Sequence, residues 1–306
     1  MPKFSDNAQH QQLSHQPLID KLIHQGGPEP EDFNALNALL YQYHVYEQAE
    51  QLHKDCKAEL FASLGEAMSL STIQGFVYNK PHGYAGDFEV IDRIYNHHIA
   101  QPKHLSKWDT FFHLQHGADA VRNRKAYFHE MLTNLEKIKS LPRVMKIGIG
   151  PGRSMYEWLN QNPDSNMIFD CIDIDAKAIA YAKELNQNFL HQITFIHKNC
   201  LRYRPSGQYD LIWSAGVFDY FDDKVFKKML ERLIPSVAKG GQIVIGNFSD
   251  NNPSRPYMEF IGEWYLHHRS PQHLIRLAEE CGVKREHIFI GCEPLGVNLF
   301  MHIAIN

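Results

Sequence analysis

The pattern of apolar and polar residues changes once along the 306-residue chain, close to Leu141. Between residues 31 and 141, apolar side chains recur every three or four positions, which is the spacing of amphipathic helices. The longest such stripe predicts a helix from Ala118 to Lys139. We therefore expect a polar tail over residues 1–30, with one short helix at Pro17–His24, followed by an all-helical region over residues 31–141.

After Leu141, short apolar runs alternate with helical stretches. This alternation predicts an α/β domain over residues 142–306, with helices on both faces of a sheet. We expect the last two runs to form a terminal strand pair. One helix is expected at Tyr257–His267, and another that reaches Val237 and is stopped by Gly240-Gly241. The predicted strands are Val144–Ile147, Met167–Asp175, Ile193–His197, Tyr209–Ser214, Gln242–Phe248, His287–Cys292 and Val297–Ile305.

Three glycines, Gly148, Gly150 and Gly152, follow the first predicted strand, and a helical pattern begins directly after them. Glycine lets a backbone turn sharply and approach a ligand, and the helix would point its N-terminus at the same place. This spacing alone fits a nucleotide-like ligand and a simple tight turn equally well. Asp173 ends the second strand about 20 residues later, a position that suits the hydroxyls of a ribose. We expect Asp175 instead to cap the helix that follows.

Further polar or small residues stand at the ends of the predicted strands. Ligands of open α/β sheets bind outside the carboxyl ends of the strands. We therefore expect one binding site at this edge, with the cofactor in contact with side chains that follow the second, third and fourth strands. These candidates are Asp173, Ile174, Asn199, Cys200, Ser214 and Ala215.

Composition narrows the class of protein. Net charge is −4, which gives no general basic field for nucleic acid, and the five cysteines are scattered without a Cys-x-x-Cys motif. The nineteen histidines show no convincing metal-ligand spacing, so no metal is expected. We find no signal-peptide pattern and no run long enough to span a bilayer, and the cytoplasm is the expected location.

At this point the region from Leu141 to Asn306 resembles the class I S-adenosylmethionine-dependent methyltransferases. The family's glycine motif matches Gly148, Gly150 and Gly152, its ribose acid matches Asp173, and its adenine-side position matches Asn199-Cys200. The resemblance implies a Rossmann-like seven-stranded sheet and S-adenosylmethionine as the cofactor. Lys146 departs from the family, which usually has Asp or Glu there, and Asn199 often is Asp.

A narrower resemblance extends the match upstream to about Leu70. It is carried by Lys80–Asp87, Ala120–Arg124, Ala215–Tyr220, Met258–Trp264 and Arg269. These segments resemble a bacterial subgroup labelled extracellular-factor 3-hydroxypalmitic acid methyl ester biosynthesis proteins. The label implies methylation of the carboxylate of a hydroxy fatty acid, a small-molecule acceptor. A carboxylate acceptor is already nucleophilic and needs no base, whereas an alcohol or amine would need one.

Several residues outside the glycine motif are assigned roles as hypotheses. Glu259, His82 and Tyr84 are the candidate catalytic bases, and Arg122 or Arg124 is expected to hold the cofactor carboxylate in place of the missing acid. The acceptor pocket is expected to contain Tyr220, Asn247, Glu259, Trp264 and Arg269, with Arg269 on an acidic substrate group.

We expect the helical region to act as a lid, with Tyr84 on the loop Lys80–Asp87 over the cofactor. The alternative is a dimerisation module, which would make the protein a homodimer. Two other functions stay open at this point. One is a cofactor-sensing protein without catalysis, and the other is a nicotinamide-dependent dehydrogenase that uses the same glycine turn and Asp173.

Overall fold

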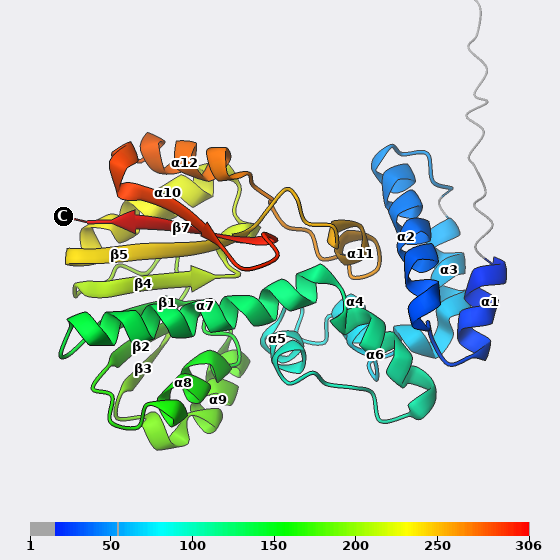
Figure 1. The fold of residues 1–306 in the computed structure, drawn as a ribbon, viewed down its shortest axis with the longest axis horizontal. Helices are drawn as coiled ribbons and strands as arrows, with labels where there is room; N and C mark the ends of the chain where they lie inside the picture. The colour runs from blue at the N-terminus through cyan, green and yellow to red at the C-terminus, as the bar shows by residue number, and fades with distance from the viewer. Residues whose placement is uncertain (1–15, 54, 306) are drawn as a thin grey trace, which may run out of the picture. The chain divides into compact units, whose positions relative to one another are not determined.

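The computed structural model describes residues 16–53 and 55–305 (Figure 1). These residues form two compact units that do not follow a single boundary in the sequence. The helical unit consists of the chain up to Gly86, together with His97–Gln115 and Ser254–Tyr265. The α/β unit consists of Asp87–Asn96, His116–Pro253 and Leu266–Asn306.

The α/β unit contains a seven-stranded sheet in the order β3-β2-β1-β4-β5-β7-β6. The first five strands pair in parallel, and β7 runs antiparallel to both β5 and β6. The sequence prediction of a seven-stranded α/β sheet with a terminal strand pair is therefore confirmed. The strands are β1 (Arg143–Ile147), β2 (Ile168–Asp173), β3 (Ile193–His197), β4 (Tyr209–Ala215), β5 (Val237–Phe248), β6 (Ile288–Cys292) and β7 (Asn298–Ala304).

Alternate residues of the central strands enter two separate cores. Met145, Ile147 and Ile212 pack with α10 (Asp223–Leu233) and α12 (Pro271–Glu280). On the opposite face, Val144, Leu211 and Trp213 pack with α7 (His116–Ile138), α8 (Arg153–Gln161) and α9 (Ala176–Leu185). The helix α5 (Phe88–Tyr95) packs against α7 and is capped by Asp87, which accepts hydrogen bonds from the N–H groups of Glu89 and Val90. The sheet thus has helices on both faces, as the alternating pattern predicts.

The helical unit is built around contacts between segments far apart in the sequence. Tyr43 and Phe260 stack with ring centroids 5.1 Å apart, and Tyr257 donates a hydrogen bond to Gln74 at 2.8 Å. The α-helices are α1 (Gln16–His24), α2 (Phe33–Gln48), α3 (Cys56–Leu64), α4 (Ile73–Asn79), α6 (Ser106–His113) and α11 (Arg255–Phe260). Short 3-10 turns complete the two units at Pro30–Asp32, Gly65–Met68, Lys103–Leu105, Gln187–Phe189, Phe218–Tyr220, Ile234–Ser236 and Arg285–His287.

The structure differs from the expected organisation in several places. The short helix in the predicted tail is present as α1, but Ile19 and Leu22 are buried, so residues 16–30 belong to the helical unit. Residues 1–15 of that tail lie outside the described residues. The long helix α7 belongs to the α/β unit because Phe128, Leu132 and Leu135 pack into the core on one face of the sheet.

Two element boundaries are also corrected. The helix expected at Tyr257–His267 ends at Phe260, and the residues after it run on without helical structure. The helix before the fifth strand ends at Leu233, one residue before the turn that contains Pro235. Val237 consequently begins β5, and Gly240-Gly241 lie within that strand.

Candidate functional site

The crossing between β1 and β4 is the place where the chain changes direction across the sheet. From β1 the chain moves outward to β2 and β3, and then returns to β4 on the other side of β1. In open α/β sheets the ligand crevice lies outside the carboxyl ends of the strands at such a switch point. Here the turn at Gly148–Gly152 and the loop that begins at Gly216 meet at this place.

The glycine turn has a backbone that other residues would not tolerate. Gly148 has a φ of +73°, and a Cβ there would lie 2.3 Å from Cγ2 of Val217 in the loop after β4. At Gly152 the φ is +72°, and a Cβ would lie 2.8 Å from Cβ of Ala182 on α9. By contrast, no described heavy atom lies within 4 Å of a Cβ built on Gly150, so its surroundings are open. The turn is therefore closed on its protein side and accessible at its centre.

Asp173 stands against this turn at the end of β2. Its Oδ2 accepts a hydrogen bond from the N–H of Gly150 at 3.3 Å, and its Oδ1 accepts one from the N–H of Asp175 at 3.0 Å. Burial raises the pKa of Asp173, although these backbone N–H groups oppose the effect. A carboxylate has about four acceptor positions, so it can still receive the hydroxyls of a ribose. Asp175 caps α9 as expected, because it accepts from the N–H of Lys177 at 2.8 Å.

The other candidates at strand ends lie where the sequence places them. Ile174 follows β2 and is 64% exposed, as a side chain that covers a flat ligand could be. Asn199 follows β3, and its Oδ1 accepts from the N–H of Leu201 at 2.8 Å, which leaves its amide N–H donors for an adenine edge. Cys200 is half-buried, and burial raises the pKa of its thiol. Ser214 donates to the carbonyl oxygen of Ile147 at 3.3 Å, which ties β4 to β1 next to Ala215.

Two cations, Lys146 and Arg124, are buried next to these loops. Lys146 is 8% exposed; its ammonium donates to Oγ of Ser154 at the start of α8 and lies 4.9 Å from the ring centroid of Phe128. Burial lowers its pKa to about 8. Arg124 is 7% exposed on α7, whereas Arg122 ion-pairs with Asp119 one turn earlier on the same helix. The structure therefore brings Arg124 rather than Arg122 to the end of β4.

Asp219 is a buried acid that the sequence analysis did not select. Its Oδ1 accepts from the N–H of Phe248 at 2.6 Å, while its Oδ2 is buried without a hydrogen-bond partner among the described residues. Burial raises the pKa of Asp219 to about 6, against the opposing effects of that N–H group, Arg124 and Arg269. Its place directly after the fourth strand was the only signal in the sequence.

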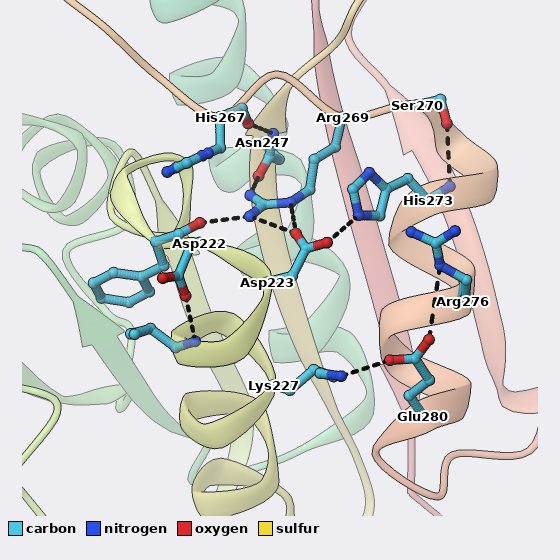
Figure 2. Close-up of polar contacts among 12 residues, drawn as sticks. Asp222, Asp223, Lys227, Asn247, His267, Arg269, Ser270, His273, Arg276 and Glu280 are labelled. Atoms are coloured by element: carbon cyan, nitrogen blue, oxygen red, sulfur yellow. Dashed lines mark hydrogen bonds and ion pairs between the residues drawn. The ribbon is translucent and has the colours of Figure 1, made fainter.

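Arg269 is a structural hub rather than an open anion site (Figure 2). It is 1% exposed, and five hydrogen bonds match the five N–H groups of its guanidinium. Nε and Nη2 each donate to Oδ1 of Asp223, and His273 contacts the other oxygen of that carboxylate at 2.7 Å. The remaining acceptors are the carbonyl oxygens of Phe218 and Phe221 and the side-chain oxygen of Asn247.

Asn247 shares in this network. Its amide nitrogen donates to the carbonyl oxygens of Phe248 at 2.8 Å and His267 at 2.9 Å, while its oxygen accepts from Arg269. Both residues were expected in the acceptor pocket. Because neither has a free polar group in the structure, they hold the loops after β4 and β5 together, and their assignment as substrate-binding residues is corrected.

The remaining residues predicted for the acceptor site are divided between the units. Tyr220 lies in the α/β unit and is exposed, whereas Glu259, Trp264, Tyr84 and His82 lie in the helical unit. Glu259 is buried, with Oε1 2.7 Å from Nε of Arg255 and Oε2 3.6 Å from Nε2 of His44. Trp264 is buried, and its N–H donates to the carbonyl oxygen of Met258.

Comparisons with known proteins agree with the fold and the glycine turn. Residues 144–241 match the sequence model of a family described as "Methyltransferase domain". A curated relative, Malonyl-[acyl-carrier protein] O-methyltransferase 2 of Ilyobacter polytropus, is 28% identical over 114 residues. That match covers 37% of this chain and 42% of the relative, so the chain spans less than half the length of this protein.

Two solved structures have a similar fold. A possible exported protein from Bordetella parapertussis aligns with a TM-score of 0.61 at 14% identity, over 99% of both chains. Magnesium protoporphyrin IX methyltransferase from Synechocystis, with bound S-adenosylhomocysteine, aligns with a TM-score of 0.53 at 14% identity, over 76% of this chain and 100% of its own. The region of residues 144–241 is a methyltransferase domain of the class I S-adenosylmethionine-dependent type, whose cofactor is S-adenosylmethionine.

The residues at the sheet edge fit this cofactor. An open position beside Gly150, an acid at the end of β2 and an amide after β3 provide the contacts that a nucleoside needs. Within residues 16–53 and 55–305, no group of three or more His, Cys, Asp or Glu is arranged to hold a metal ion. The same residues contain no helix that is long and apolar enough to cross a bilayer.

We expect Arg269→Met to lower the free energy of unfolding by about 1–3 kcal/mol. The substitution leaves the carbonyl oxygens of Phe218 and Phe221 and the amide oxygen of Asn247 without a donor. Urea unfolding measures the effect, and Arg276→Met, on an exposed arginine of α12, is the control that should change stability by less than about 0.5 kcal/mol. Unchanged stability together with weaker acceptor binding would contradict the structural role.

The buried Lys146 predicts a pH dependence of stability. The folded pKa of about 8 lies below the ordinary 10.5, so between these values the unfolded chain binds more protons than the folded chain. Stability relative to Lys146→Met should therefore rise as the pH increases from about 8 to 10.5, by up to about 3 kcal/mol. Nearby groups that set this pKa are Cys171, Asp173 and Arg124.

Urea unfolding of both proteins at several pH values measures that difference. A difference that stays flat over the whole range would mean that the ammonium is hydrated and not buried.

Proposed function

We propose that this protein is an S-adenosylmethionine-dependent methyltransferase that acts on a small molecule. The observation that carries the proposal is the contact of Asp173 with the N–H of Gly150 at 3.3 Å. It holds an acid at the end of β2 against the open glycine turn at the end of β1. This combination suits the ribose and the amino-acid portion of one extended ligand.

We further propose that the methyl acceptor is a carboxylate, and specifically that of a hydroxy fatty acid. The resemblance of Lys80–Asp87 and Ala215–Tyr220 to the methyl ester biosynthesis subgroup supports this choice. The curated relative named above is an O-methyltransferase of malonyl-[acyl-carrier protein], which gives the same direction weak support. A carboxylate does not need a catalytic base, and both oxygens of the strongest base candidate, Glu259, face Arg255 or His44.

When bound, S-adenosylmethionine supplies an electrophilic methyl group on a sulfonium ion. The task of this chain is then to hold donor and acceptor in line and to keep water away. Asp173 would orient the ribose, and the turn at Gly148–Gly152 would let the ligand approach the backbone closely. Asn199 and Cys200 would border the adenine, and Ser214 fixes the spacing of the β1 and β4 ends.

A dehydrogenase function is less consistent with the architecture. The usual dinucleotide-binding sheet has the parallel order 3-2-1-4-5-6. In this protein β7 lies between β5 and β6 and runs antiparallel to both. The spacing Gly-x-Gly-x-Gly at Gly148–Gly152 also differs from the Gly-x-Gly-x-x-Gly of those enzymes.

Binding and turnover together test the proposal. Calorimetry should detect S-adenosylhomocysteine but not NAD, and Asp173→Ala should weaken the first by roughly 10- to 150-fold, because a charged hydrogen-bond acceptor is lost. Asp175→Ala is the matched control, since it removes only the cap of α9 and should preserve affinity within about twofold.

The full-length protein should also transfer a radioactive methyl group from S-adenosylmethionine to 3-hydroxy fatty acids in a lipid extract. Cofactor binding without any methyl transfer would support a sensing protein instead. Binding of NAD in preference to S-adenosylhomocysteine would contradict the methyltransferase function.

We also propose that the loop carrying Tyr84 acts as the lid of the reaction site. Tyr84 is exposed in the structure, and a reaction at a sulfonium centre benefits from a closed, dry site. Hydrogen exchange of the backbone amides around Tyr84 should slow when S-adenosylhomocysteine is added. Protection that is confined to residues 148–153 and Asp173, with residues 78–88 unchanged, would show that the loop has no part in cofactor binding.

A further inference from the structure

Three lysine or arginine side chains are buried among the described residues: Arg124, Lys146 and Arg269. Arg269 is fully satisfied by Asp223 and its neighbours. The other two have no carboxylate within ion-pair distance in the part of the chain that the structure describes, and the guanidinium of Arg124 has no hydrogen bond there. The α/β unit therefore contains two buried cations without an acidic partner.

Arg124 lies at the end of β4. A Cβ built on Gly216 would be 3.0 Å from Nη1 of Arg124 and 3.4 Å from Nη2, so the guanidinium lies directly against this glycine. Several buried polar atoms without partners are sealed from solvent, but no atom of Arg124 is among them. Its nitrogen atoms therefore reach open space beside the loop after β4.

Lys146 approaches the same place from β1. Its side chain lies on the sheet face that packs against α7, where the ring of Phe128 is 4.9 Å from Nζ. Phe128 is four residues after Arg124, so the two cations lie near the same face of α7. The ammonium donates one hydrogen bond, to Ser154 in the first turn of α8, and can donate two more.

A buried charge without a partner is costly, and proteins retain such groups chiefly where a ligand pairs with them. The nearest acids do not neutralise this pair of cations. Asp173 is engaged by backbone N–H groups, and Asp219, although it interacts with Arg124 through space, makes its hydrogen bond to Phe248. An anion at the ends of β1 and β4 would satisfy both cations.

We propose that Arg124 and Lys146 form a carboxylate subsite that holds the amino-acid end of S-adenosylmethionine. This inference rests on the proposed function. The forked guanidinium of Arg124 suits the two oxygens of a carboxylate, and the ammonium of Lys146 supplies a second charge. The position that usually carries an acid for the ligand's amino group here carries Lys146, so the polarity of the contact is reversed and recognition shifts to the carboxylate.

Two ligands separate this subsite from the rest of the pocket. S-Adenosylhomocysteine contains the carboxylate, whereas 5′-methylthioadenosine retains the adenosine and lacks the amino-acid group. Calorimetry with Arg124→Met should show a loss of roughly 10- to 100-fold in affinity for S-adenosylhomocysteine and less than about twofold for methylthioadenosine. Lys146→Met should show the same selectivity with a smaller loss, because it removes a point charge without a fork.

Matched variants on α7 test the assignment. Lys137→Met changes an exposed lysine of the same helix and should leave both affinities unchanged. Arg122→Met should cost less than Arg124→Met, because Arg122 is paired with Asp119. A larger loss for Arg122→Met, or equal losses of both ligands in Arg124→Met, would overturn the proposal.

Thermal unfolding without ligand gives a second, independent readout. If Arg124 is retained for a ligand and not for the fold, Arg124→Met should be at least as stable as the parent protein. S-Adenosylhomocysteine should then raise the melting temperature of the parent more than that of the variant. Clear destabilisation of the ligand-free variant would indicate a structural arginine.

The outcome is separable from that of the proposed function. If the parent protein fails to bind S-adenosylhomocysteine, the proposed cofactor is wrong, and the subsite falls with it. If the parent binds and Arg124→Met binds equally well, only the carboxylate subsite is wrong.

Discussion

The close approach of Gly148 to Val217 is the constraint on which the functional edge depends. A single added carbon at Gly148 would lie 2.3 Å from the valine methyl group, so the turn after β1 and the loop after β4 lie in direct contact. This contact gives the site one closed wall. It also explains why the binding edge is made by loops: parallel strands end together, and whatever follows them must share the same limited space.

The loops at this edge are held by charge as well as by close packing. Arg269 joins the loops that follow β4 and β5 to the first turn of α10 through Asp223. Hydrogen bonds from His273 and Arg269 lower the pKa of Asp223 despite its partial burial, so this acid stays charged at neutral pH. One network therefore fixes the border of the site, while Arg124 and Lys146 next to it remain unpaired.

Much of the α/β fold could be predicted because its signals are local. Apolar runs mark the strands, and the backbone demands of Gly148 and Gly152 can be recognised from a few residues. Asp173 and Asp175 could be given different roles because one ends a strand and the other begins a helix. These inferences need only the chain within a few positions of each residue.

The roles of the arginines could not be predicted in the same way. Whether Arg269 binds a ligand or a loop depends on Asp223 and Asn247, which come from other elements. Arg122 and Arg124 differ only in the side of α7 that they occupy, and which side is buried depends on the packing of the whole helix. For the same reason, the assignment of Glu259 and Trp264 to the helical unit has no local signal.

The excursion of α11 into the helical unit has a consequence for biosynthesis. The helix α2 packs against α11, and Tyr43 stacks on Phe260, a residue that the ribosome adds more than 200 positions later. Most domains can fold as soon as they emerge, in order from the N-terminus. This helical unit can complete its core only after most of the sheet strands have been made, so during translation its early helices must wait with an apolar face uncovered.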